Sequence, residues 1–397
     1  MRVLVIHRYF WPDTPPYASM LRTIAEHLAE DGHEVEVFTA QPSYGGSSNH
    51  STRPRIESVG AVQVTRARLF KEEKTQMARR AANLLLFAAQ VFKHIVSRRE
   101  YDVVMAATTP PILVALTARL ASKAIGAKFV YHMQDIYPEV LAANESRPLG
   151  RPQQILRKID SWTTKRADKV VVLSRDMANT LGKRHATDHV RVINNFLPDS
   201  SHAETAPALG QTRWRDNSFQ VVFAGNLGNF QGLDQVVEAM RLLATDLPIH
   251  LVLLGSGAAE DSLREQAAEL VNSTIFFPGR VSQAEAEAVI AASDLALVTL
   301  NAGVIETAFP SKTMTYLSCG TPVLAAVEES SELAELLKAE AVGAACELSA
   351  VSLAEEITSI AIRPAIPSGA VVAVAEKYAS TASRLPQWSA LIGEFDV

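Results

Sequence analysis

The sequence contains few cysteines and no long apolar stretch. Two of its 397 residues are cysteines, Cys319 and Cys346, which is too few for a disulfide framework and favours a reducing compartment. No apolar run approaches the length of about eighteen residues that a membrane-spanning helix requires, and the run 84–89 ends at Gln90. The apolar core at the start of the chain is too short for a secretory signal, so we interpret it as a buried strand.

Several chemical signatures are also missing. The G-x-G-x-x-G fingerprint of dinucleotide-binding folds follows neither the first strand of the chain nor the first strand of its second half, which disfavours a nicotinamide dehydrogenase. The sequence has no aspartate pair of D-x-D spacing and no cysteine-rich ligand set. Nothing in these patterns indicates a metal ion, and we expect no other cofactor.

The composition is that of a globular protein with a sizeable core, because 48% of the residues are hydrophobic and 20% are charged. The length fits two domains. Charge is divided unevenly between them: residues 1–197 hold 28 basic and 18 acidic side chains, whereas the remainder holds 10 basic and 25 acidic ones. We expect the basic half to meet an anionic surface, such as acidic lipid head groups or phosphates, and we expect no nucleic-acid partner.

Short apolar runs alternate with amphipathic stretches along both halves, which predicts an α/β fold with two mostly parallel, doubly wound sheets. Ligands of such sheets bind beyond the carboxyl ends of the strands, so the expected site is a cleft between the two domains. The predicted segments are a first domain 1–197, a linker 198–218, a second domain 219–378 and a C-terminal helix 379–397. The expected strands are Val3–His7, Glu34–Thr39, Val62–Arg66, Val103–Ala107, Lys128–His132, Lys169–Leu173, Val190–Ile193, Val221–Ala224, His250–Leu254, Thr274–Phe277, Leu295–Thr299 and Pro322–Ala326.

The segment Arg66–Arg99 is strongly basic. It carries nine Lys or Arg residues against two Glu residues, and it includes the apolar run 84–89. An amphipathic helix with basic flanks can lie in a membrane interface, where each basic residue near an anionic leaflet contributes roughly 1 kcal/mol. The alternative is a helix that packs on the core and presents a solvated basic face. Both interpretations remain open on the sequence alone.

Two segments of the second half have the chemistry of a phosphate site. Gly225 and Gly228 lie in a glycine-rich turn, 225–233, between an expected strand and an expected helix, where the backbone can approach a bound group. Further on, Ser311 and Lys312 are expected at the start of a helix. Free N–H groups, a hydroxyl and an ammonium would together form an anion cradle there, unless Lys312 is an ordinary solvated lysine.

Several short motifs, each weak alone, form a specific pattern when their order along the chain is considered. They are Arg8-Tyr9-Phe10-Trp11-Pro12, Gly32-His33-Glu34-Val35-Glu36-Val37, Gln134-Asp135-Ile136-Tyr137-Pro138-Glu139, Gly225-Asn226-Leu227-Gly228 with Gln231-Gly232-Leu233, and Pro310-Ser311-Lys312 with Tyr316-Leu317 and Gly320-Thr321-Pro322. In this order and at these spacings they resemble the GT-B glycosyltransferases of the large retaining family 4. The likeness runs over nearly the whole chain. It is strongest to the sub-group that builds bacterial surface polysaccharides, including fucosamine- and colanic-acid-type transferases.

This resemblance implies two Rossmann-like domains, with the acceptor bound mainly by the first and a nucleotide sugar mainly by the second. It also implies C-terminal helices that cross back to the first domain, and chemistry without a metal ion. Asn226 and Gln231 stand where many members have Arg and Lys, so Lys312 would supply the missing positive charge. Besides the catalytic residues Lys312 and Glu306, the implied donor-binding residues are Gly225, Asn226, Gly228, Gln231, Arg280, Ser311 and Thr315.

The first domain would hold the acceptor. Pro16 and Tyr17 stand where the family has a Gly-Gly acceptor loop, and His132, Asp135 and Glu139 follow the fifth expected strand. A carboxylate at the carboxyl end of a strand is placed to meet a ligand. Asp135 could accept a hydrogen bond from the acceptor hydroxyl or stabilise positive charge at the anomeric carbon of the sugar. The alternatives are that Asp135 caps a turn and that His132 is a buried structural histidine.

The expected activity is transfer of a sugar, with retention, from a UDP- or GDP-sugar to a hydroxyl of a lipid-linked or surface-glycan acceptor. Two alternatives stay open. One is a sugar-nucleotide epimerase, which uses a two-domain fold of the same kind. The other is a catalytically inactive, glycosyltransferase-like binding subunit that is tethered to a membrane by its basic half. We expect the protein to be cytoplasmic, either free or peripheral on the inner face of the cell membrane.

Overall fold

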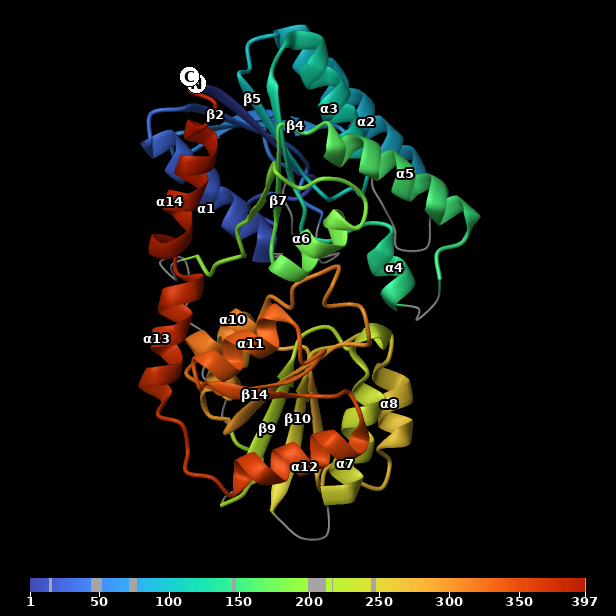
Figure 1. Ribbon diagram of the computed structural model, residues 1–397, viewed down its shortest axis with the longest axis vertical. Helices are drawn as coiled ribbons and strands as arrows, with labels where there is room; N and C mark the ends of the chain where they lie inside the picture. Colours follow the sequence, from blue (N-terminus) through green and yellow to red (C-terminus); the bar gives the residue numbers. More distant parts are fainter. Residues whose placement is uncertain are drawn as a thin grey trace. The chain divides into compact units, whose positions relative to one another are not determined.

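The computed structural model describes residues 1–13, 16–43, 52–70, 77–144, 148–198, 212–215, 217–243 and 248–396. The chain divides into two compact units: unit 1 is Met1–Glu139, Leu149–Pro198 and Thr381–Val397, and unit 2 is Val140–Pro148 and Asp199–Ser380. Each unit has helices on both faces of one sheet (Figure 1). The predicted fold class, with two mostly parallel α/β sheets, is confirmed. Most of the predicted linker 198–218 lies outside the described residues.

Unit 1 is built on an eight-stranded sheet with the order β3-β4-β2-β1-β5-β6-β7-β8. β3 pairs antiparallel with β4, and the other pairs are parallel. The central strands are continuous apolar runs because both faces of the sheet are covered by helices. The strands are β1 (Arg2–Ile6), β2 (Glu34–Ala40), β3 (Ile56–Val59), β4 (Val62–Ala67), β5 (Val103–Ala107), β6 (Lys128–His132), β7 (Lys169–Val172) and β8 (Val190–Val192).

One strand of this sheet, β3, is not predicted from the sequence. Its four residues have a single buried side chain, Val59, so the segment lacks the apolar run by which the other strands are found. β3 is an edge strand that turns into β4 through Gly60 and Ala61. Its place in the sheet comes from pairing with β4 rather than from its own composition.

The C-terminal helix is part of unit 1. Helix α14 (Thr381–Gly393) packs against α1 (Pro16–Glu30), and Trp388 of α14 lies in the hydrophobic core of the unit. His27 Nε2 and Ser389 Oγ join the two helices at 2.8 Å. The predicted return of the C-terminal helix to the first sheet is confirmed. The other helices of the first half are α2 (Met77–Arg98), α3 (Leu113–Ile125), α4 (Glu139–Asn144), α5 (Arg151–Lys165) and α6 (Arg175–Gly182).

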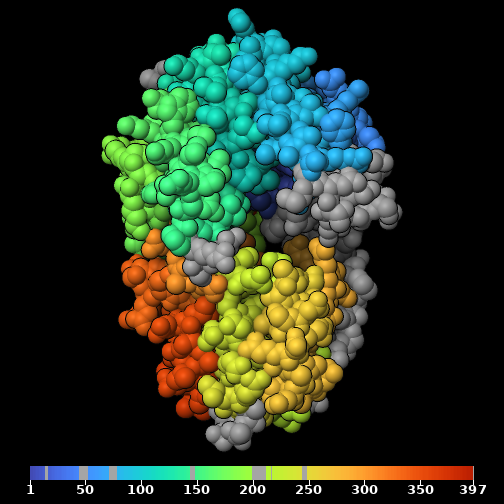
Figure 2. Space-filling view, turned by 90° about the vertical axis from the view of Figure 1, so that its right-hand side faces the viewer, coloured from blue at the N-terminus to red at the C-terminus, as the bar shows by residue number. Residues whose placement is uncertain are grey.

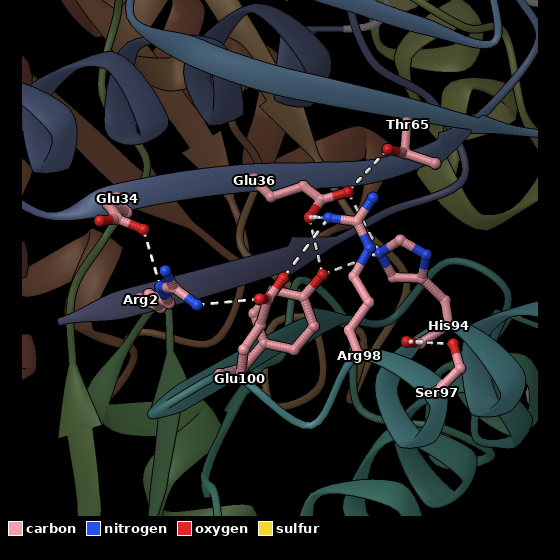
Figure 3. Close-up of polar contacts among 9 residues, drawn as sticks. Arg2, Glu34, Glu36, Thr65, His94, Ser97, Arg98 and Glu100 are labelled. Atoms are coloured by element: carbon pink, nitrogen blue, oxygen red, sulfur yellow. Dashed lines mark hydrogen bonds and ion pairs between the residues drawn. The ribbon is translucent and has the colours of Figure 1, made fainter.

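A buried carboxylate fastens α2 to the first sheet (Figure 3). Glu36 of β2 accepts hydrogen bonds from Thr65 Oγ1 and Tyr101 Oη, each at 2.6 Å, and from Arg98 Nη1 at 2.9 Å. His94 Nε2 lies 3.1 Å from the same carboxylate. Burial alone would raise the pKa of Glu36, but the hydrogen bonds from His94, Thr65 and Tyr101 lower it to about 2. Glu36 is therefore ionised at neutral pH and fixes which face of α2 points inward.

Unit 2 is built on a parallel six-stranded sheet with the order β11-β10-β9-β12-β13-β14. The chain order reverses between β9 and β12, which is the switch point where ligands of doubly wound folds bind. The five strands predicted here are confirmed, and β14 is added; its sequence, GAAC, has no β-branched or aromatic residue. The strands are β9 (Phe219–Ala224), β10 (Ile249–Leu254), β11 (Ile275–Gly279), β12 (Leu295–Thr299), β13 (Val323–Ala326) and β14 (Gly343–Cys346). The helices are η1 (Asn229–Gln231), α7 (Leu233–Leu243), α8 (Glu260–Gln266), α9 (Gln283–Ala291), α10 (Lys312–Ser318), α11 (Glu332–Ala339), α12 (Ala350–Ala361) and α13 (Ser368–Ala379).

Candidate functional site

The loops that follow β9, β10 and β11 are joined backbone to backbone at the carboxyl edge of the second sheet. Gly225 N donates to Leu254 O at 2.9 Å, and Gly255 N donates to Gly279 O at 2.9 Å. Gly255 has a φ of 126°, and a Cβ on it would lie 1.9 Å from Gly225 O, so any other residue would force the loops apart. These contacts fix the glycine-rich turn 225–233 beside the switch point.

Lys312, the first residue of α10, directs its ammonium at this turn. Its Nζ donates a hydrogen bond to Gln231 Oε1 at 3.0 Å and lies 3.6 Å from the centre of the Phe223 ring. The same atom lies 3.4 Å from the position that a Cβ on Gly225 would take. Lys312 has no carboxylate partner in the described part of the chain, and burial lowers its pKa to about 7. A half-buried cation without a counter-charge favours binding of an anion.

The loop that follows β12, residues 300–311, is tied to the glycine-rich turn. Asn301 N donates to Phe230 O at 2.9 Å, and Asn301 Nδ2 donates to Asn229 O at 3.2 Å. The approach is close, because a Cβ on Gly232 would lie 3.0 Å from Asn301 Oδ1. The loops of the two strands that flank the switch point therefore form one connected surface, and Lys312 lies on it.

The other predicted donor residues lie on the same strand ends or on α10, but among the described residues none of them is hydrogen-bonded to Lys312. Ser311 precedes α10, and its side chain does not cap the helix. Thr315 is half-buried within α10, and Gly228 is buried in the glycine-rich turn. The residues of this group with exposed side chains are Asn226, Arg280, Glu306 and Ser311. The structure thus brings together Gly225, Gln231 and Lys312, and their predicted roles stay predictions.

In unit 1 the predicted acceptor residues, half-buried Tyr17 and buried His132, form a chain of hydrogen bonds. Tyr17 Oη lies 2.9 Å from His132 Nδ1, and Gln134 Nε2 lies 2.8 Å from His132 Nε2. Gln134 Oε1 accepts a further bond from Asn195 Nδ2. Burial lowers the pKa of His132 to about 3, so its ring is neutral. Because the amide of Gln134 donates to Nε2, the ring proton sits on Nδ1 and is donated to Tyr17. The other predicted acceptor residue, Pro16, begins α1.

Asp135 differs from its neighbours because its carboxylate makes no hydrogen bond or ion pair in the described part of the chain. The alternative role of Asp135, to cap the turn before Tyr137, is therefore not supported, because such a cap would be a hydrogen bond from its carboxylate. Burial raises the pKa of Asp135 to about 6, so the ionised form is held at an energetic cost near neutral pH. A carboxylate without a partner at the end of a strand is available to a ligand.

Glu139, in contrast, is engaged inside the protein. Its Oε1 accepts from Arg184 Nε and from Arg157 Nε, each at 2.9 Å, and its Oε2 pairs with Arg184 Nη2. Arg184 also pairs with Asp160 at 2.5 Å. Both carboxylate oxygens of Glu139 are thus occupied, and its contact with an acceptor stays a prediction.

One polar residue at the edge of the second sheet is not singled out by the sequence patterns. Glu328 follows β13, and its Oε1 accepts a hydrogen bond from Gly303 N at 2.6 Å, within the loop that follows β12. The rule that selects Asp135, a carboxylate directly after an expected strand, also applies to Glu328. Among the described residues no three His, Cys, Asp or Glu side chains gather as ligands for a metal ion.

The architecture defines the class of protein. Two doubly wound α/β units, a final helix that belongs to the first unit, and a cationic site at the switch point of the second are features of GT-B glycosyltransferases. Residues 17–195 match the family described as "Glycosyl transferase 4-like domain", and residues 208–365 match "Glycosyl transferases group 1". The chain belongs to the group 1, or family 4, glycosyltransferases.

The chain is similar to two curated bacterial proteins. It is 29% identical over 304 residues to a probable glycosyltransferase, WbjE of Pseudomonas aeruginosa, covering 75% of this chain and 70% of WbjE. It is 26% identical over 352 residues to WcaI of Escherichia coli (strain K12), to which a role as a colanic acid biosynthesis glycosyl transferase is attributed; 85% of this chain and 86% of WcaI are covered. Among solved structures, Anabaena Alr3699/HepE in complex with UDP-glucose has a TM-score of 0.68 at 18% identity, covering 99% of this chain and 100% of that one. This last likeness shows the fold.

Proposed function

We propose that the protein transfers a sugar, with retention of configuration, from a nucleoside-diphosphate donor to a hydroxyl of a lipid-linked or surface-glycan acceptor. The observation that carries the proposal is Lys312, a half-buried cation at the switch point of unit 2 that has no carboxylate partner among the residues the structure describes. A diphosphate would supply the missing counter-charge. The complexes of Anabaena HepE with UDP and with UDP-glucose support a UDP-sugar, and a GDP-sugar remains the alternative.

The role of unit 2 in this reaction would be to stabilise the leaving group, which is the nucleoside diphosphate. As the bond between the anomeric carbon and the diphosphate breaks, negative charge grows on the phosphate oxygens and positive charge on the sugar. Lys312 and the amides of the glycine-rich turn would stabilise the diphosphate. The acceptor hydroxyl would attack from the face that the diphosphate leaves, with a donor phosphate oxygen taking its proton.

Unit 1 would bind the acceptor. Asp135, whose carboxylate has no hydrogen-bond partner among the described residues, would accept a hydrogen bond from the acceptor hydroxyl. The hydrogen bond between Tyr17 and the neutral His132 would hold the end of β6, which precedes Asp135, in place.

Release of nucleoside diphosphate should depend on an added acceptor, and the product should keep the anomeric configuration of the donor. Chromatography of the nucleotides and the anomeric proton signals in NMR spectra measure the two properties. Isolated acceptor glycans, with and without their lipid carrier, serve as substrates. Interconversion of donor sugars without acceptor would instead identify an epimerase, and the absence of any nucleotide binding at millimolar concentration would identify an inactive binding subunit.

A membrane surface is the second partner that we propose, and it would meet the outer face of α2. Within the described part of the chain no helix has the length and apolarity to cross a bilayer. Leu85 and Phe92 are seven residues apart on one face of α2 and are 63% and 42% exposed. Arg79, Arg80 and Lys93 of the same helix are also exposed. α3 packs between α2 and α5, and Figure 2 shows these helices on one outer face of unit 1.

Fewer basic side chains of the segment Arg66–Arg99 can contact a membrane than the sequence suggests. Arg66 is buried and paired with Glu57, and Arg98 is paired with Glu36. Two further lysines, Lys71 and Lys74, lie outside the described residues. The neighbouring helix α5 adds an exposed apolar side chain, Ile155, and exposed basic ones, Arg151 and Lys158. An apolar strip with basic flanks is the pattern of an interfacial helix.

The protein should float with vesicles that contain acidic lipid at low salt, and salt should weaken the association. Reversal of charge in the triple variant Arg79→Glu, Arg80→Glu and Lys93→Glu should reduce the floated fraction about tenfold or more, because roughly 1 kcal/mol per basic residue is lost and repulsion is added. Lys338→Glu, an exposed position on α11, is the matched control and should float normally. Equal recovery of the wild type with neutral and acidic vesicles would reject an electrostatic contact.

A further inference from the structure

Within the described part of the chain, Glu328 uses only one of its two carboxylate oxygens for a hydrogen bond. Its Oε1 accepts a hydrogen bond from Gly303 N at 2.6 Å. Its Oε2 is buried, and in the described part of the chain this oxygen has no hydrogen-bond partner. A buried polar atom without a partner is costly and rare in native proteins. An unused carboxylate oxygen at the ligand-binding edge of a sheet therefore points to a hydrogen-bond donor on the ligand.

The strand order places Glu328 to one side of the phosphate site. Lys312 contacts the turn after β9, and Glu328 follows β13, two strands further along the sheet. Neighbouring strands are about 4.8 Å apart, so the ends of β9 and β13 are separated by roughly 10 Å. Gly303, which binds Glu328, lies on the same loop as Asn301, which binds the glycine-rich turn. One hydrogen-bonded loop thus links Glu328 to the phosphate site.

The donor is a linear chain of base, ribose, diphosphate and sugar, so it extends from the phosphate site in two directions. The direction toward β10 and β11 leads to Arg280, a predicted donor-binding residue that the family resemblance puts near the nucleotide base. The opposite direction leads to β13 and Glu328. A carboxylate would repel phosphate, but it is a strong acceptor for a hydroxyl group. The polyhydroxylated part of the donor on that side is the transferred sugar.

We propose that Glu328 Oε2 accepts a hydrogen bond from a hydroxyl of the transferred sugar and so helps to select the sugar. This inference rests on the proposed function. A site built to bond a hydroxyl discriminates against analogues that lack it, because the buried carboxylate oxygen is then left without a donor. Glu328 would therefore act on the choice of sugar and not on the affinity for the nucleotide.

The test compares two ligands that differ only in the sugar. Calorimetry measures the binding of UDP and UDP-glucose, or of GDP and GDP-mannose, to the wild type and to Glu328→Gln, which keeps an oxygen for the bond to Gly303. We expect the affinity of the nucleoside diphosphate to stay within about twofold, and the affinity of the nucleotide sugar to fall roughly ten- to hundredfold. Glu329→Gln, the adjacent exposed carboxylate, is the matched control and should bind both ligands normally.

The possible outcomes separate this inference from the proposed function. An equal loss for both ligands would place Glu328 against the nucleotide or in the support of the loop, and no loss for either would leave it outside the site; both results overturn the sugar contact alone. A wild type that binds none of the four ligands would overturn the proposed function and this inference with it. The unfolding temperature of Glu328→Gln, measured without ligand, shows whether the loop is intact.

Discussion

Replacement of Lys312 by alanine is expected to lower the turnover number by about 10²–10³, the typical effect of removing one donor to a developing negative charge. The ammonium of Lys312 is hydrogen-bonded to Gln231 and lies against the Phe223 ring. We therefore expect no exposed basic side chain to replace it in the variant. The measurement is the rate of acceptor-dependent release of nucleoside diphosphate at saturating donor. Lys338→Ala, which removes an exposed lysine of the same unit, should leave the rate unchanged.

A companion variant separates this loss from a loss of folding. Burial lowers the pKa of Lys312 from 10.5 to about 7. Burial of the charged ammonium lowers the free energy of unfolding, and this effect is full below about pH 7, where Lys312 is charged in both the folded and the unfolded protein. The effect disappears as the pH rises to about 10.5, where the unfolded chain also loses the proton. Lys312→Met should accordingly unfold at a higher temperature than the wild type at pH 7, and this advantage should fade toward pH 10. Near-normal turnover in Lys312→Ala would remove Lys312 from the mechanism.

Asp135→Asn is expected to lower turnover by about 10² while making the folded protein more stable near neutral pH. Burial raises the pKa of Asp135 from 3.8 to about 6. The buried charge lowers the free energy of unfolding, fully above about pH 6, where Asp135 is ionised in both states. The effect vanishes below about pH 3.8, where the carboxyl group is protonated in both states. A shift of this size corresponds to about 3 kcal/mol in the free energy of unfolding. The gain should thus be seen at pH 8 and be absent at pH 3.5.

The combination of lower activity and higher stability distinguishes a ligand-binding carboxylate from a structural one. Denaturant unfolding at the two pH values and acceptor-dependent turnover are measured on the same preparations. Asp188→Asn, an exposed position in unit 1, should change neither. Loss of stability in Asp135→Asn at pH 8 would show that the carboxylate supports the fold, and unchanged turnover would exclude it from the reaction.

Most of the strands that the sequence predicts correctly carry continuous or alternating apolar residues, such as Val170–Val172 in β7. β3 and β14 are missed for a physical reason. β3 is an edge strand with one buried side chain, and β14 consists of Gly, Ala, Ala and Cys. Both occupy their places through backbone pairing with a stronger neighbour, which local composition does not reveal.

The site is predicted in part. Motif order brings Gly225, Gln231 and Lys312 to one edge, and the structure places them in contact. Sequence patterns do not show pairing between distant charges. The engagement of Glu139 by Arg184 and Arg157 depends on helices that meet only in the folded chain. The unused oxygen of Glu328 likewise becomes visible only when its surroundings are known.

The central claim, that Lys312 binds the diphosphate of the donor, is tested most directly by calorimetric titration of UDP and GDP into the wild type and into Lys312→Ala. We expect the wild type to bind one of the two nucleotides. Its affinity should fall above pH 7 by up to about tenfold per pH unit, because binding requires the protonated ammonium. Lys312→Ala should bind at least about tenfold more weakly at pH 6.5 and lose the pH dependence. Equal affinity of the two proteins at every pH would contradict the account.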